Sequence, residues 1–161
     1  NEMKSRDIIK LIVSIVACQG AGLIGSLFIT TAIPTWYAGL QKPFFTPPNW
    51  VFAPAWITLY MLMAVAAFLI WRKDLDQKGV RFALIIFLIQ LVLNTLWSIV
   101  FFGLESPFHG IMVIIALWIA ILLTMIKFFK LSTIAGALLT PYIAWVSFAA
   151  VLNVAIWMLN P

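Results

Sequence analysis

Five long runs without a charged residue decide what this chain can fold into. Each run is longer than the roughly 20 apolar residues that a helix needs to cross about 30 Å of hydrocarbon. Only 9% of the 161 residues are charged, whereas a soluble domain has roughly one quarter. A water-soluble globule of this size cannot bury so much apolar surface, so lipid is the expected solvent. The runs are Leu11–Ile33, Pro43–Trp71, Phe82–Leu104, Ser106–Ile126 and Leu131–Pro161.

These runs predict an all-α integral membrane protein with a bundle of five transmembrane helices in a single domain, 1–161. The structural rival is a transmembrane barrel, whose strands alternate apolar and polar residues over about ten positions. The runs here are continuously apolar, which favours helices. A structured loop rich in Trp and Pro is expected between the first two helices. The helices are expected at about 9–31, 49–71, 81–103, 108–129 and 133–159.

The ten Lys and Arg residues are distributed unevenly between the two ends of the predicted spans. Nine lie in the N-terminal segment, the second connection and the fourth connection, and Lys42 alone lies on the other side. Cytoplasmic loops carry the excess of Lys and Arg, so the N-terminus is expected in the cytoplasm and the first loop, 31–48, outside. The net charge of +5 is therefore a topology signal and does not indicate binding to nucleic acid.

Polar residues inside the spans are few, and acids and bases are absent apart from His109 near one end. Gln90, Asn94 and Ser98 are spaced four apart, which places them on one helical face. Such a stripe serves as hydrogen-bonding contact between helices or as the polar wall of a cavity. Ion-coupled pumps generally carry a charged residue at depth, and this pattern is missing. No Cys or His cluster has the spacing of a metal site, so neither a metal nor an obligatory cofactor is expected.

The connection between the first two spans differs from the other loops. The segment "WYAGLQKPFFTPPNWVFAPAW" (36–56) concentrates tryptophans and prolines, and prolines restrict the backbone. Trp56, Trp97 and Trp145 lie deeper within spans, where a buried indole N–H needs a hydrogen-bond partner. A rigid aromatic loop above such rings predicts a lid over a ring-lined cavity that suits a large flat ligand.

Four segments resemble the signature blocks of the TspO/MBR family of tryptophan-rich sensory and translocator proteins. They are "WYAGLQKP", "PPNWVFAPAWITLY", "LNTLWSIVFFG" and "PYIAWVSFAAVLN". The resemblance covers all five spans in order. It implies a five-helix bundle that forms a homodimer, with a lipophilic pocket beneath the first loop. It also implies that protoporphyrin IX or haem is a possible ligand, and, for the animal members, cholesterol and synthetic isoquinolines.

The resemblance also implies roles for individual residues that match the family's motifs. Trp56 and Trp145 match two pocket tryptophans implicated in light-dependent porphyrin breakdown in some bacterial members. Trp36 and Tyr37 match a pair in the lid, and Asn94 matches a polar residue of the pocket. The face of the fifth helix that contacts the ligand is matched by Ala149 and Leu152. Trp97 is expected on the same cavity because it lies beside the polar stripe.

Two positions depart from the pattern of the animal members. Val154 and Met158 stand where the cholesterol motif has a Tyr and a basic residue. His109 stands where the animal proteins have a pocket Trp. His109 is either a helix-end residue at the membrane interface or a residue of the pocket mouth that stacks on a ligand ring, pairs with a carboxylate or ligates haem iron. Lys42 similarly suits a ligand carboxylate or is a solvated surface lysine.

Three functions remain open at this point. The favoured one is a membrane receptor or carrier for tetrapyrroles and other flat lipophilic molecules. The second is an enzyme that degrades a porphyrin in light, with Trp56 and Trp145 as its reactive residues. The third is a sterol- or lipid-binding regulator without turnover. The expected partners are the bilayer, the lipophilic ligand and a second copy of the chain.

Overall fold

The computed structural model describes residues 4–161, which are helical throughout apart from loops and turns. Five stretches of helix are long and apolar enough to cross a membrane, which confirms the predicted fold class and the number of spans. The long helices are α1 (Ser5–Ala32), α2 (Phe52–Trp71), α3 (Val80–Ser98), α4 (Pro107–Leu131) and α6 (Thr140–Leu159), and the short α5 (Thr133–Leu138) precedes α6.

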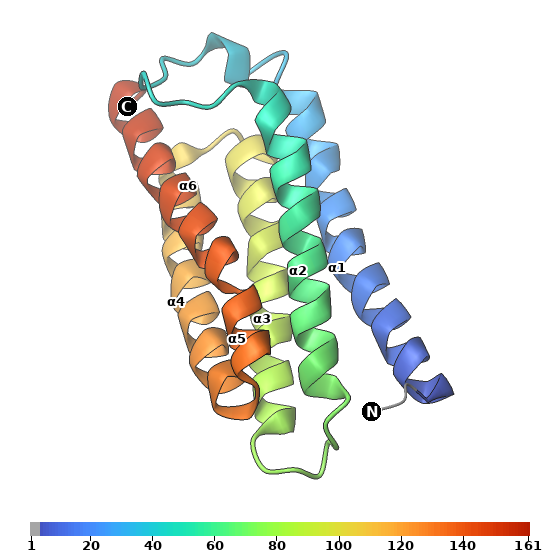
Figure 1. The fold of residues 1–161 in the computed structure, drawn as a ribbon. Coiled ribbons are helices and arrows are strands. Elements are labelled where there is room, and N and C mark those ends of the chain that lie inside the picture. Colours follow the sequence, from blue (N-terminus) through green and yellow to red (C-terminus); the bar gives the residue numbers. More distant parts are fainter. Residues whose placement is uncertain (1–3) are drawn as a thin grey trace.

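The helices form a closed bundle (Figure 1). α1 packs against α2 and α3, α3 packs against α4, and α4 packs against both α5 and α6. α2 contacts the short α5 extensively but hardly touches α6. The bundle is therefore tight at the α5 end and leaves room between α2 and α6 toward the other end. The N-terminal end of α1 lies at the α5 end, and the long loop between α1 and α2 covers the opposite end beside the C-terminus (Figure 1).

The bundle carries apolar side chains on its outside and polar side chains in its interior, as expected of a protein surrounded by lipid. Large apolar side chains such as Val16, Leu23 and Val92 face outward and are exposed. The polar stripe on α3 faces inward, since Gln90, Asn94 and Ser98 are all buried. Polar groups cost less inside such a bundle than against hydrocarbon, because neighbouring helices supply hydrogen-bond partners.

Small residues bring α1 and α2 close together, as their spacing in the sequence suggests. A Cβ atom added to Gly22 would lie 2.6 Å from the Tyr60 ring. No side chain larger than hydrogen fits at this position while Tyr60 keeps its place in the core.

Two predicted helix boundaries differ from the structure for identifiable reasons. The first helix begins at Ser5 rather than near residue 9, because the Asp7 carboxylate accepts the Lys4 N–H at 3.2 Å and caps the first turn. The fifth span, expected as one helix over 133–159, is divided at Leu139 into α5 and α6. Pro141 lies in the first turn of α6, and since proline lacks an N–H, the helical hydrogen-bond ladder is interrupted there.

The third span ends as predicted near residue 103, but its last turn is a π-helix. This turn comprises Ile99–Gly103, and the Leu104 N–H donates to the Ile99 carbonyl at 2.9 Å. π-turns are frequent at functional sites because the extra residue redirects side chains. Here the turn places Phe101 and Phe102 in the interior, below the long loop.

Candidate functional site

The loop between α1 and α2 is an ordered cover held to the end of α6. It contains two short 3₁₀ helices, Tyr37–Gly39 and Asn49–Val51. The Gln41 N–H donates to the Asn160 side-chain oxygen at 3.0 Å, and the Asn160 side-chain NH₂ donates back to the Gln41 carbonyl at 2.8 Å. This reciprocal pair fixes the loop to the C-terminal end of the bundle. The sequence offered no signal for Asn160, because the bond joins positions 119 residues apart.

Tyr37 anchors this cover to the interior. Its side chain is 1% exposed, with Phe52 at 6.3 Å and Phe102 at 5.7 Å between ring centroids. The Lys42 ammonium lies 4.7 Å from the Tyr37 ring centre and donates to the Leu40 carbonyl at 3.2 Å. Burial raises the pKa of the Tyr37 hydroxyl to about 12, so the hydroxyl stays protonated at neutral pH and can donate a hydrogen bond.

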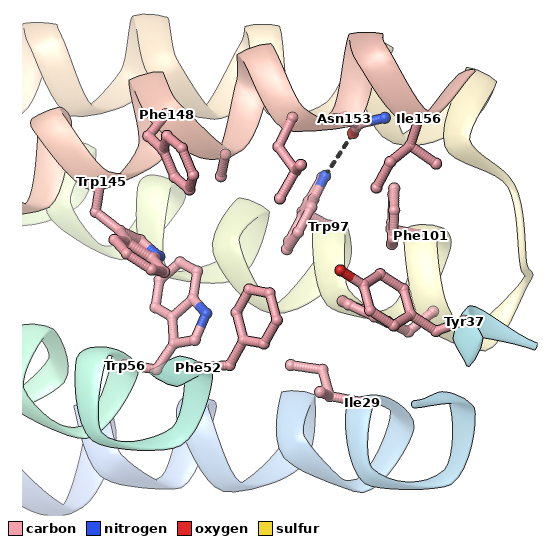
Figure 2. A pocket seen from close by; sticks show the side chains of 13 residues that line it. Ile29, Tyr37, Phe52, Trp56, Trp97, Phe101, Trp145, Phe148, Asn153 and Ile156 are labelled. Carbon is pink, nitrogen blue, oxygen red and sulfur yellow. Dashed lines mark hydrogen bonds between the residues drawn. The ribbon is translucent and has the colours of Figure 1, made fainter. Parts of the chain in front are cut away.

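An aromatic cavity lies directly beneath the loop, between α2 and α6 (Figure 2). Its volume is about 30 Å³, which is room for roughly two water molecules. Rings from the loop, α2, the α3 end and α6 form most of the wall. The lining residues are Ile29, Tyr37, Phe52, Trp56, Trp97, Phe101, Phe102, Trp145, Phe148, Ala149, Leu152, Asn153 and Ile156.

Two polar atoms of this wall are buried without a hydrogen-bond partner among residues 4–161. They are the Tyr37 hydroxyl and the Trp145 indole nitrogen. Trp97, by contrast, donates its indole N–H to the Asn153 side-chain oxygen at 3.0 Å (Figure 2), and Asn153 in turn donates to the Pro107 carbonyl. A buried donor without a partner costs about 1–3 kcal/mol. Tyr37 and Trp145 therefore offer two donors to whatever occupies the cavity.

Trp56 and Trp145 lie together on the side of the cavity away from Tyr37 (Figure 2). Their ring centroids are 6.3 Å apart and the rings are nearly perpendicular, at 88°. Trp56 also packs on Tyr60, at 5.7 Å. The two tryptophans that the family resemblance pairs are thus neighbours on the cavity wall.

A separate polar network lies beyond this wall, and Asn94 belongs to it. The Tyr60 hydroxyl donates to the Asn94 oxygen at 2.6 Å, and the Asn94 NH₂ donates to the Tyr142 hydroxyl at 2.6 Å. Tyr142 then donates to the Gln90 oxygen at 2.7 Å. Both polar atoms of Asn94 are therefore engaged, and Asn94 is not among the residues that line the cavity. The stripe on α3 serves as contact between helices at this position.

Six of the ten predicted ligand-binding residues line the cavity: Tyr37, Trp56, Trp97, Trp145, Ala149 and Leu152. Besides Asn94, three others do not. Trp36 packs edge-to-face with Phe101, at 5.5 Å between ring centroids, and Lys42 lies on the Tyr37 ring. His109 is exposed at the start of α4, where its Nδ1 lies 2.7 Å from the Ser106 hydroxyl. The structure thus places His109 as a helix-end residue.

The sequence argument missed seven lining residues, and helical spacing could have found several of them. Trp145, Ala149, Leu152 and Ile156 follow one another at intervals of three and four, and Phe148 lies three residues after Trp145, which places all five on one face of a helix. Phe52 lies one turn before Trp56 on α2. Phe101 and Phe102 could not be found this way, because the π-turn changes which side chains face inward.

A wider groove adjoins the cavity on the side of α1. It lies between α1 and α2, has a volume of about 650 Å³ and is lined by apolar residues with a few hydroxyl and amide groups. Ile29, Phe52 and Trp56 line both the groove and the cavity. These three side chains are the partition between them.

The fold and the cavity define a class of protein: a helical membrane protein whose bundle encloses an aromatic cavity under an ordered loop. The profile of the TspO/MBR family matches residues 14–158 of this chain. Since the match covers nearly the whole chain, the protein belongs to the TspO/MBR family, as the resemblance of its motifs indicated.

Relatives from distant organisms have similar lengths. The chain is 46% identical over 155 residues to the tryptophan-rich protein TspO of Archaeoglobus fulgidus, which covers 96% of this chain and 99% of the relative. It is 40% identical over 157 residues to the protein of the same name from Chlorobaculum tepidum, with 98% and 99% covered. It is 35% identical over 139 residues to the human translocator protein, with 85% and 82% covered.

Proposed function

We propose that this protein is a membrane receptor or carrier that binds a flat lipophilic ligand, of the tetrapyrrole class exemplified by protoporphyrin IX, in the aromatic cavity. The observation that carries the proposal is the pair of unpartnered donors, Tyr37 and Trp145, in a wall made otherwise of rings and aliphatic groups. Ligand sites have this composition, with few polar groups that fix orientation. Relatives named "tryptophan-rich sensory protein" and "translocator protein" support a sensing or carrying role.

The ligand requires the cavity to open. Sites for molecules of this size measure about 300–1,000 Å³, and the cavity holds only about 30 Å³. Rotation of the Phe52 or Trp56 ring would join the cavity to the groove of about 650 Å³, and such rotamer changes are common on binding. The ligand would then be stacked among the rings, with its acceptor atoms near Tyr37 and Trp145.

Filling the cavity should weaken binding. Ala149 is buried on the α6 face that lines the cavity, so Ala149→Trp is expected to weaken porphyrin affinity at least about tenfold by steric exclusion. Titration of the purified protein with protoporphyrin IX, followed by quenching of tryptophan fluorescence, measures this. Val151→Trp is the matched control, because Val151 faces lipid on the same helix. Equal affinities in the two variants would place the ligand elsewhere.

Light-dependent degradation of the bound porphyrin is a second candidate function, favoured by the contact between Trp56 and Trp145 on the cavity wall. The receptor function predicts that the Trp56→Phe/Trp145→Phe double variant still binds the porphyrin, because phenylalanine retains much of the stacking area, with affinity about tenfold weaker because the Trp145 N–H is lost. It also predicts that illumination of either protein yields no new absorbing product. A photoproduct formed by the wild type and lost in the double variant would establish the enzymatic function instead.

We also propose that the loop end of the bundle faces away from the cytoplasm, because nine of the ten Lys and Arg residues lie at the other end. In a background with Cys18 replaced, Gln41→Cys in the loop is expected to react with a membrane-impermeant maleimide on intact cells. Gln77→Cys, between α2 and α3, is expected to react only after lysis. Labelling of the Gln77 variant alone in intact cells would reverse the orientation.

A further inference from the structure

The end of the bundle opposite the aromatic cavity carries a basic groove, defined here as the depression between the start of α1, the end of α2 and the start of α3. Its volume is about 390 Å³. Figure 1 shows the N-terminal end of α1 and the α2–α3 loop at this same end of the bundle. The cations that line the groove are Arg6, Lys10, Arg72 and Arg81, and the other lining residues are Asp74, Leu75 and Asp76.

Two of the four cations are engaged within the protein. The Arg72 guanidinium lies 4.0 Å from the Asp7 carboxylate. The Lys10 ammonium donates to the Trp71 carbonyl at 3.2 Å and lies 5.6 Å from the Trp71 ring centre. Within residues 4–161 the Arg72–Asp7 contact is the sole ion pair at 4.0 Å or less.

Arg6 and Arg81 therefore lie in the groove without a carboxylate partner in the part of the chain that the structure describes. Both side chains are exposed. Asp74 and Asp76 in the groove and Asp7 beside Arg72 reduce the positive charge but do not cancel it, since four cations face three acids. The N-terminal ends of α1 and α3 add partial positive charge at the same place, and the C-terminal end of α2 offsets part of it. The groove thus attracts an anion.

The position of the groove relative to the membrane narrows the class of anion. Arg72 directly follows Trp71, the last residue of the spanning helix α2, and tryptophans prefer the depth of the lipid head groups. Leu75 is the one leucine in the otherwise polar loop "RKDLDQKG", and its side chain is 41% exposed in the groove. Cations at this depth, beside an exposed apolar side chain, match the head group of a phospholipid.

We propose that the basic groove binds the phosphate of an anionic phospholipid, with Arg6 and Arg81 contacting the phosphate and Leu75 packing against the rest of the head group. This site is independent of the aromatic cavity and does not rest on the function proposed for it. Guanidinium groups suit the task because their planar fork matches phosphate oxygens.

Native mass spectrometry of the purified protein in detergent, titrated with phosphatidylglycerol or phosphatidylcholine, tests the proposal. We expect phosphatidylglycerol to bind at least about tenfold more tightly than phosphatidylcholine. The Arg6→Gln/Arg81→Gln variant should lose at least about tenfold of that affinity. Both side chains are exposed, so the variant is expected to fold, and an unchanged circular dichroism spectrum checks this.

The matched control is Lys127→Gln/Lys130→Gln, which removes the same charge from the end of α4 outside the groove and should leave the affinity unchanged. Equal losses in the two double variants would overturn the site, because binding would then follow net charge alone. Equal affinity for the two lipids would overturn it as well. Complete displacement of phosphatidylglycerol by millimolar inorganic phosphate would show a site for small anions and reject the lipid.

Discussion

Replacing Tyr37 with phenylalanine is expected to raise the stability of the ligand-free protein and to weaken porphyrin binding. The Tyr37 hydroxyl is buried without a hydrogen-bond partner, so its removal should relieve about 1 kcal/mol of desolvation cost. If the hydroxyl donates to the ligand, the same change should weaken affinity about tenfold. Thermal unfolding in detergent and fluorescence titration with protoporphyrin IX measure the two effects.

Stability and porphyrin affinity are expected to change in opposite directions, and this combination distinguishes a ligand-binding hydroxyl from a structural one. The control is Tyr142→Phe, which removes a buried hydroxyl that is fully engaged with Asn94 and Gln90. This variant should lower stability and leave affinity unchanged, because Tyr142 does not line the cavity. A Tyr37→Phe variant that loses stability and binds the porphyrin as well as the wild type would remove Tyr37 from the site.

Asn94→Leu is expected to destabilise the bundle by about 2 kcal/mol. Leucine is close to asparagine in size but makes none of its hydrogen bonds, so the Tyr60 hydroxyl would lose its acceptor and Tyr142 its donor. The bonds join α2, α3 and α6, so their loss weakens contacts among three helices. Reversible unfolding in mixed micelles gives the free energy of unfolding.

Thr124→Val is the matched control for Asn94→Leu. Thr124 is equally buried, but its hydroxyl donates to the Ala120 carbonyl of its own helix. The control should therefore cost less than about 0.5 kcal/mol, the scale of an intrahelical side-chain bond. Porphyrin affinity of the folded Asn94→Leu protein should equal that of the wild type, because Asn94 lies behind the cavity wall. A large loss of porphyrin affinity at unchanged stability would show that Asn94 contacts the ligand.

The sequence by itself determined the number of spans, their approximate ends and the face of α3 that turns inward. These features follow from one-dimensional properties: an apolar run must be long enough to cross hydrocarbon, and residues four apart lie on one side of a helix. The same reasoning placed Trp56, Trp97 and Trp145 at depth. It did not predict the break at Leu139, although Pro141 supplies its cause.

Only the tertiary structure decided which inward-facing side chains line the cavity and which form hydrogen bonds with other side chains instead. Gln90, Asn94 and Ser98 share a helical face. The side chain of Asn94, however, forms its hydrogen bonds with Tyr60 and Tyr142 from other helices. His109 and Tyr37 both lie at the loop end, yet His109 is exposed and Tyr37 is buried. The reason is physical: burial and hydrogen bonding depend on side chains that approach from other helices, and spacing along one helix carries no information about those partners.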